Sequence, residues 1–135
     1  MLSLTADYAL RAILVLAREP RGTAVQSDRI AAAIDAPRNY LSKTMNALAK
    51  AGIVASARGP LGGFVLTQDP SSLSVARVAE VFDEPRLHRK CLLGRRQCDA
   101  DNPCAAHARW STMMRSARAP LTTTSIADLL GRNGI

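Results

Sequence analysis

Two short amphipathic segments on either side of Asp35-Ala36-Pro37 place the strongest restriction on the fold of this 135-residue chain. Apolar residues recur at helical spacing in both segments, which predicts a short helix that starts within residues 25–28 and is broken by Asp35-Ala36-Pro37, and a second helix from Pro37 to about Ala51. Proline suits the first turn of a helix, and aspartate tolerates the left-handed backbone of a tight turn. A short helix, a tight turn and a second helix with a polar, basic start are the plan of a helix-turn-helix motif.

The segments on both sides of this motif predict a winged version of it. The spacing of apolar residues predicts an amphipathic helix over residues 4–18. Downstream, short apolar runs at 53–57 and 64–67 enclose Arg58-Gly59-Pro60-Leu61-Gly62-Gly63, which is typical of a β-hairpin. A hairpin that directly follows a helix-turn-helix motif is a wing.

Helices dominate the remainder of the chain. They are predicted over residues 75–82, 103–118 and 124–131, with Asp83-Glu84-Pro85 ending the first and Pro120 ending the second. The predicted fold class is therefore mainly α with a small β-hairpin. We divide it into a winged helix-turn-helix domain over residues 1–70, followed by a cysteine-rich loop and a long C-terminal helix within residues 71–135.

Charge and composition narrow the class of function. The net charge of +7 and the pI of about 10.2 favour a polyanionic partner. No apolar run approaches the roughly 20 residues of a membrane span, and no secretory signal is evident, so we expect a cytoplasmic protein without membrane contact. The sequence lacks a Ser/His/Asp arrangement, a paired-carboxylate motif and a phosphate-binding loop, which argues against an enzyme.

The polar face of the second helix and the tip of the wing are candidate contacts to duplex DNA. Arginine and lysine read guanine edges and asparagine reads adenine, while a wing arginine can enter a narrow minor groove. Glycines in the wing allow a close approach to phosphate. The simpler alternative is a solvated helix face and an ordinary surface hairpin. The predicted DNA-contacting residues are Ser27, Arg38, Asn39, Tyr40, Ser42, Lys43, Arg58, Gly62 and Gly63.

All three cysteines lie in one polar stretch and form a candidate metal site. They are Cys91, Cys98 and Cys104, and His107 follows the last of them at i+3. Residues three apart share one face of a helix, and thiolates and imidazoles are metal ligands. A helix that starts with an asparagine cap and a proline at residues 102–103 would place Cys104 in its first turn, where the helix dipole stabilises a thiolate.

Other interpretations of the cysteines remain open. They include buried apolar residues, oxidisable thiols, a disulfide with one thiol left over, and a zinc site. The polar surroundings argue against a core position, and the absence of a secretory signal argues against stable disulfides. The gaps of six and five residues are longer than in the Cys-x-x-Cys pairs of zinc sites, which favours a flexible loop around an iron–sulphur cluster.

The long C-terminal helix carries an apolar stripe at helical spacing. Trp110, Met113, Met114 and Ala117 form this stripe. It could belong to the core of one chain. Because the winged domain already has its own core elements, we expect the stripe to pack against a second copy of the chain.

The order of these parts resembles the IscR/NsrR family of bacterial winged-helix regulators. The resemblance covers nearly the whole chain and rests on five motifs. They are Leu4-Thr5-Ala6-Asp7-Tyr8-Ala9-Leu10-Arg11, Pro37-Arg38-Asn39-Tyr40-Leu41-Ser42-Lys43, Arg58-Gly59-Pro60-Leu61-Gly62-Gly63-Phe64, the three-cysteine loop, and Ile126-Ala127-Asp128-Leu129-Leu130.

This resemblance implies a homodimer on a palindromic operator and an iron–sulphur cluster held by the three cysteines and one further ligand. His107 matches the fourth ligand of IscR-like members and is preferred, which implies a 2Fe–2S cluster. Asp7 of the partner subunit matches the carboxylate ligand of some nitric-oxide sensors, which implies a 4Fe–4S cluster. The chain departs from the family in its six-residue first gap, in Leu61 of the wing and in Ser42, which replaces an IscR-like glutamate.

We therefore predict a transcriptional regulator, a repressor, whose DNA affinity is controlled by a cluster that senses nitric oxide, redox state or iron and cluster status. The alternatives are a metal-free thiol switch and a zinc-stabilised regulator. A small iron–sulphur carrier protein is a more distant alternative, because a carrier needs neither a wing nor a recognition helix.

Overall fold

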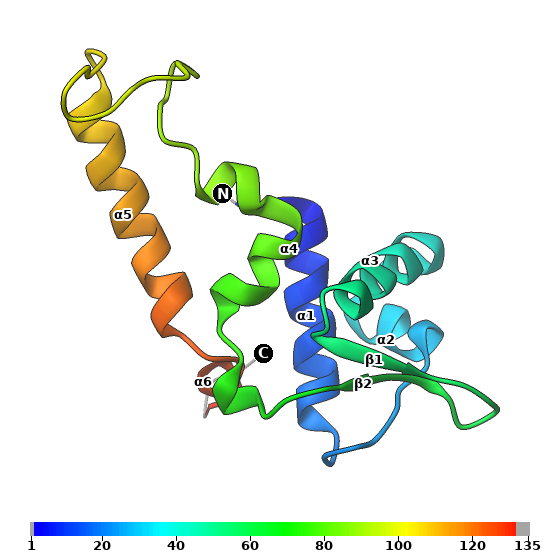
Figure 1. Ribbon diagram of the computed structural model, residues 1–135. Coiled ribbons are helices and arrows are strands. Elements are labelled where there is room, and N and C mark those ends of the chain that lie inside the picture. Colours follow the sequence, from blue (N-terminus) through cyan, green and yellow to red (C-terminus); the bar gives the residue numbers. More distant parts are fainter. Residues whose placement is uncertain (1, 132–135) are drawn as a thin grey trace.

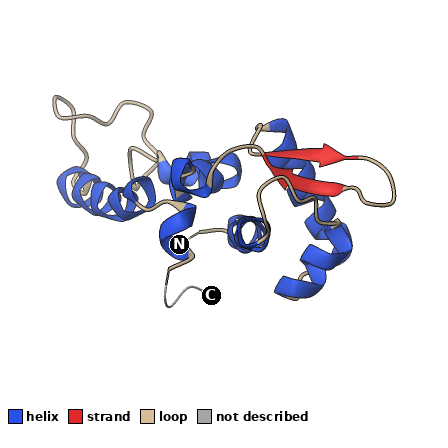
Figure 2. Cartoon of the chain, turned by 90° about the horizontal axis from the view of Figure 1, so that it is seen from below, coloured by secondary structure: helices blue, strands red, loops and turns tan. Residues whose placement is uncertain are grey.

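The computed structural model describes residues 2–131, which form a mainly helical structure with one two-stranded antiparallel hairpin at its side (Figures 1 and 2). The predicted fold class is confirmed. The elements in chain order are α1 (Leu4–Arg18), α2 (Ser27–Ile34), α3 (Arg38–Lys50), β1 (Val54–Ala57), β2 (Gly63–Leu66), the short 3-10 helix η1 (Pro70–Ser72), α4 (Val75–Leu87), α5 (His107–Thr123) and α6 (Ile126–Leu129).

Helix α1 lies at the centre of the fold. Its start is capped by the hydroxyl of Ser3, which accepts a hydrogen bond from the Ala6 N–H at 3.2 Å. It contacts α2, α3, α4, α6 and β2. Its fully buried side chains are Ala6, Ala9, Ala12, Ile13, Leu14 and Leu16. Three alanines in this set let the surrounding helices approach α1 closely.

The two helices of the motif meet at a left-handed residue. Asp35 ends α2 with φ 53° and ψ 48°, and Pro37 directly precedes α3. Helix α2 buries Ile30 and Ile34, while α3 buries Leu41, Thr44, Met45 and Leu48. The predicted helix-turn-helix segment is therefore confirmed, because both helices place their apolar stripes on the core around α1.

The wing is fixed at its root by glycine geometry. Strand β1 pairs antiparallel with β2, from Val54 opposite Leu66 to Ala57 opposite Gly63. Val25, just before α2, exchanges two backbone hydrogen bonds with Phe64, at 2.9 and 2.8 Å. Gly63 has φ +134°, and a Cβ there would lie 2.2 Å from the Val25 carbonyl oxygen. The wing and the helix-turn-helix motif are thus joined where only glycine fits.

Two predicted helix ends are wrong, because both helices continue through a proline. Helix α4 extends past Pro85 to Leu87, and α5 extends past Pro120 to Thr123. In each case, residues beyond the proline keep the helix in place. Leu87 is buried, and Leu121 packs against the core.

Helix α5 stands apart from the winged body in Figure 1. None of its seventeen residues, all of which are described, is fully buried. It packs along α4, and Met113 is 53% exposed. Within the part of the chain that the structure describes, no helix combines the length and the apolar character needed to cross a bilayer.

The contact at Gly63 gives a stability prediction. We expect Gly63→Ala to lower the free energy of unfolding by about 3 kcal/mol or more, since the new Cβ would collide with the Val25 backbone in a conformation that L residues avoid. Urea or thermal denaturation measures the change. Gly22→Ala is the control, with φ +81° but no atom within 4 Å, and should cost only about 1–2 kcal/mol. Equal losses in both variants would contradict the steric argument.

Candidate nucleic-acid interface and metal centre

The start of α3 presents polar side chains to solvent. Arg38, Asn39 and Lys43 are exposed, and Ser42 is half-buried. The Ser42 hydroxyl donates to the Arg38 carbonyl at 3.0 Å, one turn earlier. The guanidinium of Arg38 donates two hydrogen bonds to the carboxylate of Asp28 on α2. The structure thus brings the predicted major-groove residues together at one end of one helix.

Tyr40 connects this helix start to α1. Its ring packs edge-to-face against Tyr8, with 5.6 Å between the ring centroids, and its hydroxyl is hydrogen-bonded to that of Thr5. Its carbonyl accepts the buried Thr44 hydroxyl at 3.0 Å. Tyr40 therefore holds α3 against the central helix α1, so part of this predicted DNA-contacting side chain is engaged within the protein.

The wing presents its tip next to the start of α2. Arg58 is exposed at this tip, and Ser27 opens α2 half-buried. Gln26 donates from Nε2 to the Pro60 carbonyl at 3.1 Å, which ties the tip to α2. Gly62 and Gly63 approach the backbone of their own chain closely, at Ala57 and Val25, so their close contacts are internal.

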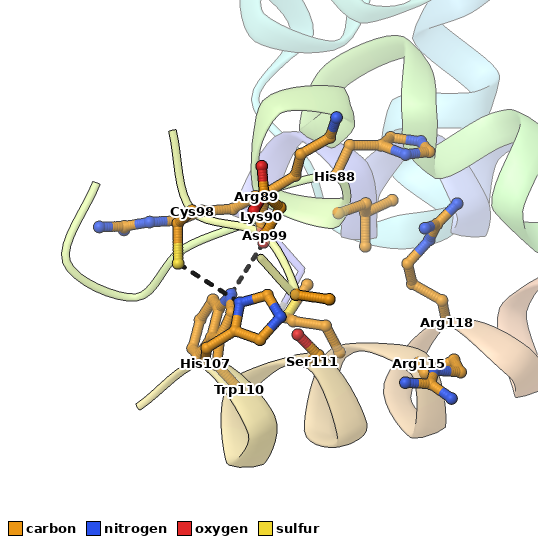
Figure 3. Close-up of a pocket in the computed structure, with 13 residues that line it drawn as sticks. His88, Arg89, Lys90, Cys98, Asp99, His107, Trp110, Ser111, Arg115 and Arg118 are labelled. Atoms are coloured by element: carbon orange, nitrogen blue, oxygen red, sulfur yellow. Dashed lines mark hydrogen bonds between the residues drawn. The ribbon is translucent and has the colours of Figure 1, made fainter. Parts of the chain in front are cut away.

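The cysteines form a compact group at the top of α5. The Sγ atoms of Cys91, Cys98 and Cys104 all lie within 4.8 Å of one another, and those of Cys91 and Cys104 are 3.7 Å apart. His107 points its Nδ1 at the Cys98 sulphur from 3.3 Å, as Figure 3 shows. Cys91 and Cys98 are buried. The three predicted thiols therefore converge, and His107 joins them through its contact with Cys98.

Local hydrogen bonds give the loop this shape. Arg89 donates to the carbonyls of Cys91 and Leu92, at 3.0 and 2.7 Å. The indole N–H of Trp110 donates to the Arg89 carbonyl at 2.8 Å, which fastens the start of the loop to α5. The Asp99 carboxylate accepts the backbone N–H groups of residues 101 and 102, at 3.0 and 2.8 Å.

This loop geometry corrects the predicted helix start. Helix α5 begins at His107, so Cys104 precedes it and does not lie in its first turn. Asn102 does not cap the helix, because Ala106 is the N-cap residue of α5 and the Asn102 side-chain oxygen accepts from Arg95 instead. Cys104 and His107 are instead linked by a backbone hydrogen bond of 3.1 Å across one turn.

The thiols differ in acidity. Burial raises the pKa of Cys91, yet the backbone N–H groups of Arg95 and Leu93 and the neighbouring thiols outweigh this and lower its pKa to about 7. A backbone hydrogen bond at Cys104 lowers the pKa of Cys98, but burial and the other two thiols outweigh it and raise its pKa. As the pH rises, Cys91 therefore loses its proton before Cys98 does.

The donor set fits a soft metal or an iron–sulphur cluster. Three thiols and an imidazole are the ligand types of both zinc and iron–sulphur sites. Two thiolates on one tetrahedral zinc ion, each with a bond of about 2.3 Å, lie about 3.8 Å apart. The 3.7 Å between Cys91 and Cys104 agrees with a shared metal atom. Among the described residues of one chain, Asp7 does not belong to this group, and its carboxylate pairs with Arg11 at 3.0 Å.

A hollow of about 390 Å³ opens beside the cysteines, between the end of α4 and α5 (Figure 3). Cys98, His107 and Trp110 lie at one end, and Arg115 and Arg118 lie farther along α5. Met114 also lines it, so one side of the predicted dimerisation stripe faces the hollow while Met113 faces solvent.

Sequence reasoning missed several residues that build these sites. Asp28 holds Arg38, and Gln26 holds the wing. Arg89 organises the cysteine loop, and Trp110 fastens it in addition to its place in the apolar stripe. These contacts join residues from different elements, so spacing along the chain gives no signal for them.

A helix-turn-helix motif with a wing, followed by a cysteine loop and a long helix, defines a winged-helix transcriptional regulator. The chain belongs to the Rrf2 family, whose description is iron-dependent transcriptional regulator and whose model matches residues 2–132. The resemblance found in the sequence motifs is thereby confirmed.

Similar proteins agree with this assignment. An HTH-type transcriptional regulator of Aquifex aeolicus is 35% identical over 93% of this chain and 88% of its own length. IscR of Yersinia pestis is 30% identical over 95% of this chain and 77% of its own length. The structure of T. potens IscR superposes with a TM-score of 0.77 at 25% identity, over 96% of this chain and 85% of that one. CymR of B. subtilis, a global cysteine regulator, has the same fold, with a TM-score of 0.78 at 23% identity over 96% and 95% of the two chains.

The acidity of Cys91 predicts a pH dependence in the reduced, metal-free protein. We expect the first thiolate to form with a midpoint of about pH 7, because the folded-state pKa of Cys91 is lowered and deprotonation increases as pH rises through it. Ultraviolet thiolate absorbance measures this titration. Cys91→Ser should remove the first step, whereas an unchanged first step in that variant would contradict the assignment.

Proposed function

We propose that this chain is a DNA-binding transcriptional repressor whose operator affinity is controlled by an iron–sulphur cluster. The observation that carries this proposal is the convergence of three thiols, with His107 Nδ1 3.3 Å from one of them, where the loop after α4 joins α5. A family described as iron-dependent and a winged-helix fold support it.

The DNA-binding part rests on charge and shape. The chain carries a net charge of +7, and α3 and the wing present Arg38, Asn39, Lys43 and Arg58 to solvent. Tyr40 and Ser42 fix the start of α3, Gly62 and Gly63 fix the wing root, and Ser27 opens α2. We assign α3 to the major groove and the wing to the minor groove or backbone of a palindromic operator.

The cluster part rests on the donor set. Cys91, Cys98, Cys104 and His107 would hold the cluster, which favours the 2Fe–2S form, and Asp7 of the partner subunit is the alternative fourth ligand of a 4Fe–4S form. A bound cluster would supply sensitivity to nitric oxide, redox state or iron supply. A single zinc ion is the second candidate for this site, because the 3.7 Å between two sulphurs suits one tetrahedral ion.

The protein would act as a homodimer. Helix α5 stands apart from the winged body, and its stripe of Trp110, Met113, Met114 and Ala117 is only partly covered in one chain. A second copy of α5 is the partner that such a stripe suits. Two recognition helices would then face half-sites about one helical turn apart. The cysteine loop borders α5, the proposed dimer helix. Ordering of this loop by a bound cluster would therefore set the distance between the two recognition helices of the dimer.

The ligand assignment predicts a contrast between the two histidines. After anaerobic reconstitution with iron and sulphide, His107→Ala should lose or alter the visible absorption of the cluster, because a donor is missing. His88→Ala should keep it, since His88 pairs with Glu80 at 3.3 Å outside the thiol group. Each Cys→Ser variant should lose the cluster. Native mass spectrometry of the intact dimer gives the iron and sulphide content.

Operator binding tests the control step. We expect cluster-loaded and cluster-free dimers to differ in affinity for a selected operator by about tenfold or more at matched salt, and each to prefer it over unrelated duplex by roughly 10³ or more. Equal operator affinity of the two forms would refute control by the cluster. If the anaerobically purified protein contains zinc and no iron, the site holds a structural ion and not a cluster.

The dimer assignment predicts a matched pair of variants on α5. Met113→Glu should weaken dimerisation at least tenfold, because it places a charge in the stripe, where burial of an unpaired charge is costly. Thr112→Glu, on the opposite face of the helix, should leave it unchanged. Sedimentation velocity measures both. A Met113→Glu protein that remains fully dimeric would show that another surface forms the dimer.

A further inference from the structure

The recognition helix α3 begins with an arginine that is held from another helix. Nε of Arg38 donates to Oδ1 of Asp28 at 2.9 Å, and Nη2 donates to Oδ2 at 2.6 Å. Asp28 lies in the first turn of α2, so the pair joins the two helices of the motif. Both side chains are more than half exposed, at 73% for Arg38 and 56% for Asp28.

This fork leaves the outer edge of the guanidinium free. Asp28 occupies Nε and one N–H of Nη2, which leaves both N–H groups of Nη1 and the second one of Nη2. One N–H of each Nη atom then points along the end of the side chain. That arrangement matches the O6 and N7 acceptors of guanine in the major groove. The carboxylate also fixes the plane of a long side chain that would otherwise lose rotamer entropy on binding.

Fold stability does not account for this pair. Exposed ion pairs contribute little to folding. Helix α3 starts without a side-chain hydrogen bond to its cap, and Arg38 places a cation at the positive end of the helix dipole, where an acidic residue would be favourable. The position is therefore poor for helix stability, and the compensating charge is supplied from α2.

We infer that Asp28 is a positioning residue for sequence recognition: it holds Arg38 in the orientation that reads one guanine in each half-site. Asp28, Arg38, Asn39 and Ser42 line a single hollow at the start of α3, which places the pair on the surface assigned to the major groove. This inference rests on the proposed DNA-binding function. It adds which base Arg38 recognises, a guanine, and which residue holds Arg38 in place, Asp28.

Selection from a random-sequence duplex DNA library tests this role with the full-length dimer. Wild type should select an operator with one guanine per half-site that Arg38→Gln no longer requires, because glutamine does not pair with the O6 and N7 acceptors of guanine. Asp28→Asn should reduce discrimination against other bases at that same position by on the order of tenfold, the range of one bidentate base contact. Its affinity for non-specific duplex should stay equal or rise, because a negative charge next to phosphate is removed.

A matched control separates this role from a general charge effect. Glu19→Gln removes another carboxylate that pairs with an α2 arginine, Arg29 at 3.0 Å, and should leave base preference unchanged. Thermal unfolding should show Asp28→Asn and Glu19→Gln to be folded like wild type.

Two outcomes overturn the inference. If Asp28→Asn keeps the full guanine preference of wild type, the carboxylate does not position Arg38. If Arg38→Gln lowers the salt slope of binding by about one without a base-dependent effect, Arg38 contacts phosphate. In both cases the DNA-binding function stands. If wild type selects no sequence at all, the proposed function falls with it.

Discussion

The burial of α1 is the constraint on which the rest of the structure depends. Its apolar face is covered by α2, α3, α4, α6 and β2, so one helix supplies a wall of the core to almost every other element. Ala9 and Ala12 are completely buried on this face. Because their side chains are a single methyl group, the helix-turn-helix motif and α4 can both lie close to α1. Bulkier residues there would separate the recognition surface from the part of the chain that leads to the cysteines.

The start of α1 contacts both the helix that leads to the cysteine loop and the helix that carries the proposed DNA contacts. The buried carboxylate of Asp83, near the end of α4, accepts the Ser3 N–H at 2.7 Å. Thr5 and Tyr8, on the first turn of α1 and the next, contact Tyr40 of α3, the proposed recognition helix. Helix α4 leads directly into the cysteine loop. A short series of polar and aromatic contacts therefore connects the base of the loop to α3, without a flexible linker between them.

Local chemistry was enough to predict the winged half of the fold. The apolar spacing of the helices, Asp35 in the left-handed turn and the glycine-rich hairpin all act through near neighbours, which a sequence displays. At Pro85 and Pro120 the same local rules predict helix ends that the structure does not have. Rules for proline are local, whereas Leu87 and Leu121 continue the helices by packing on distant parts of the chain.

The two candidate sites also differ in how far local sequence patterns could predict them. The spacing of the cysteines points to one site, and the three thiols do lie together with His107 beside Cys98, although the expected helix start at Cys104 does not exist. Asp28 could not be found this way. In the sequence it looks like an ordinary acidic residue in the first turn of a helix, where it complements the dipole of α2. Arg38, ten residues later, looks like a solvent-exposed cation without a partner. Only the angle between two helices turns these residues into a bidentate pair, because the partner of an exposed charge is decided by tertiary geometry.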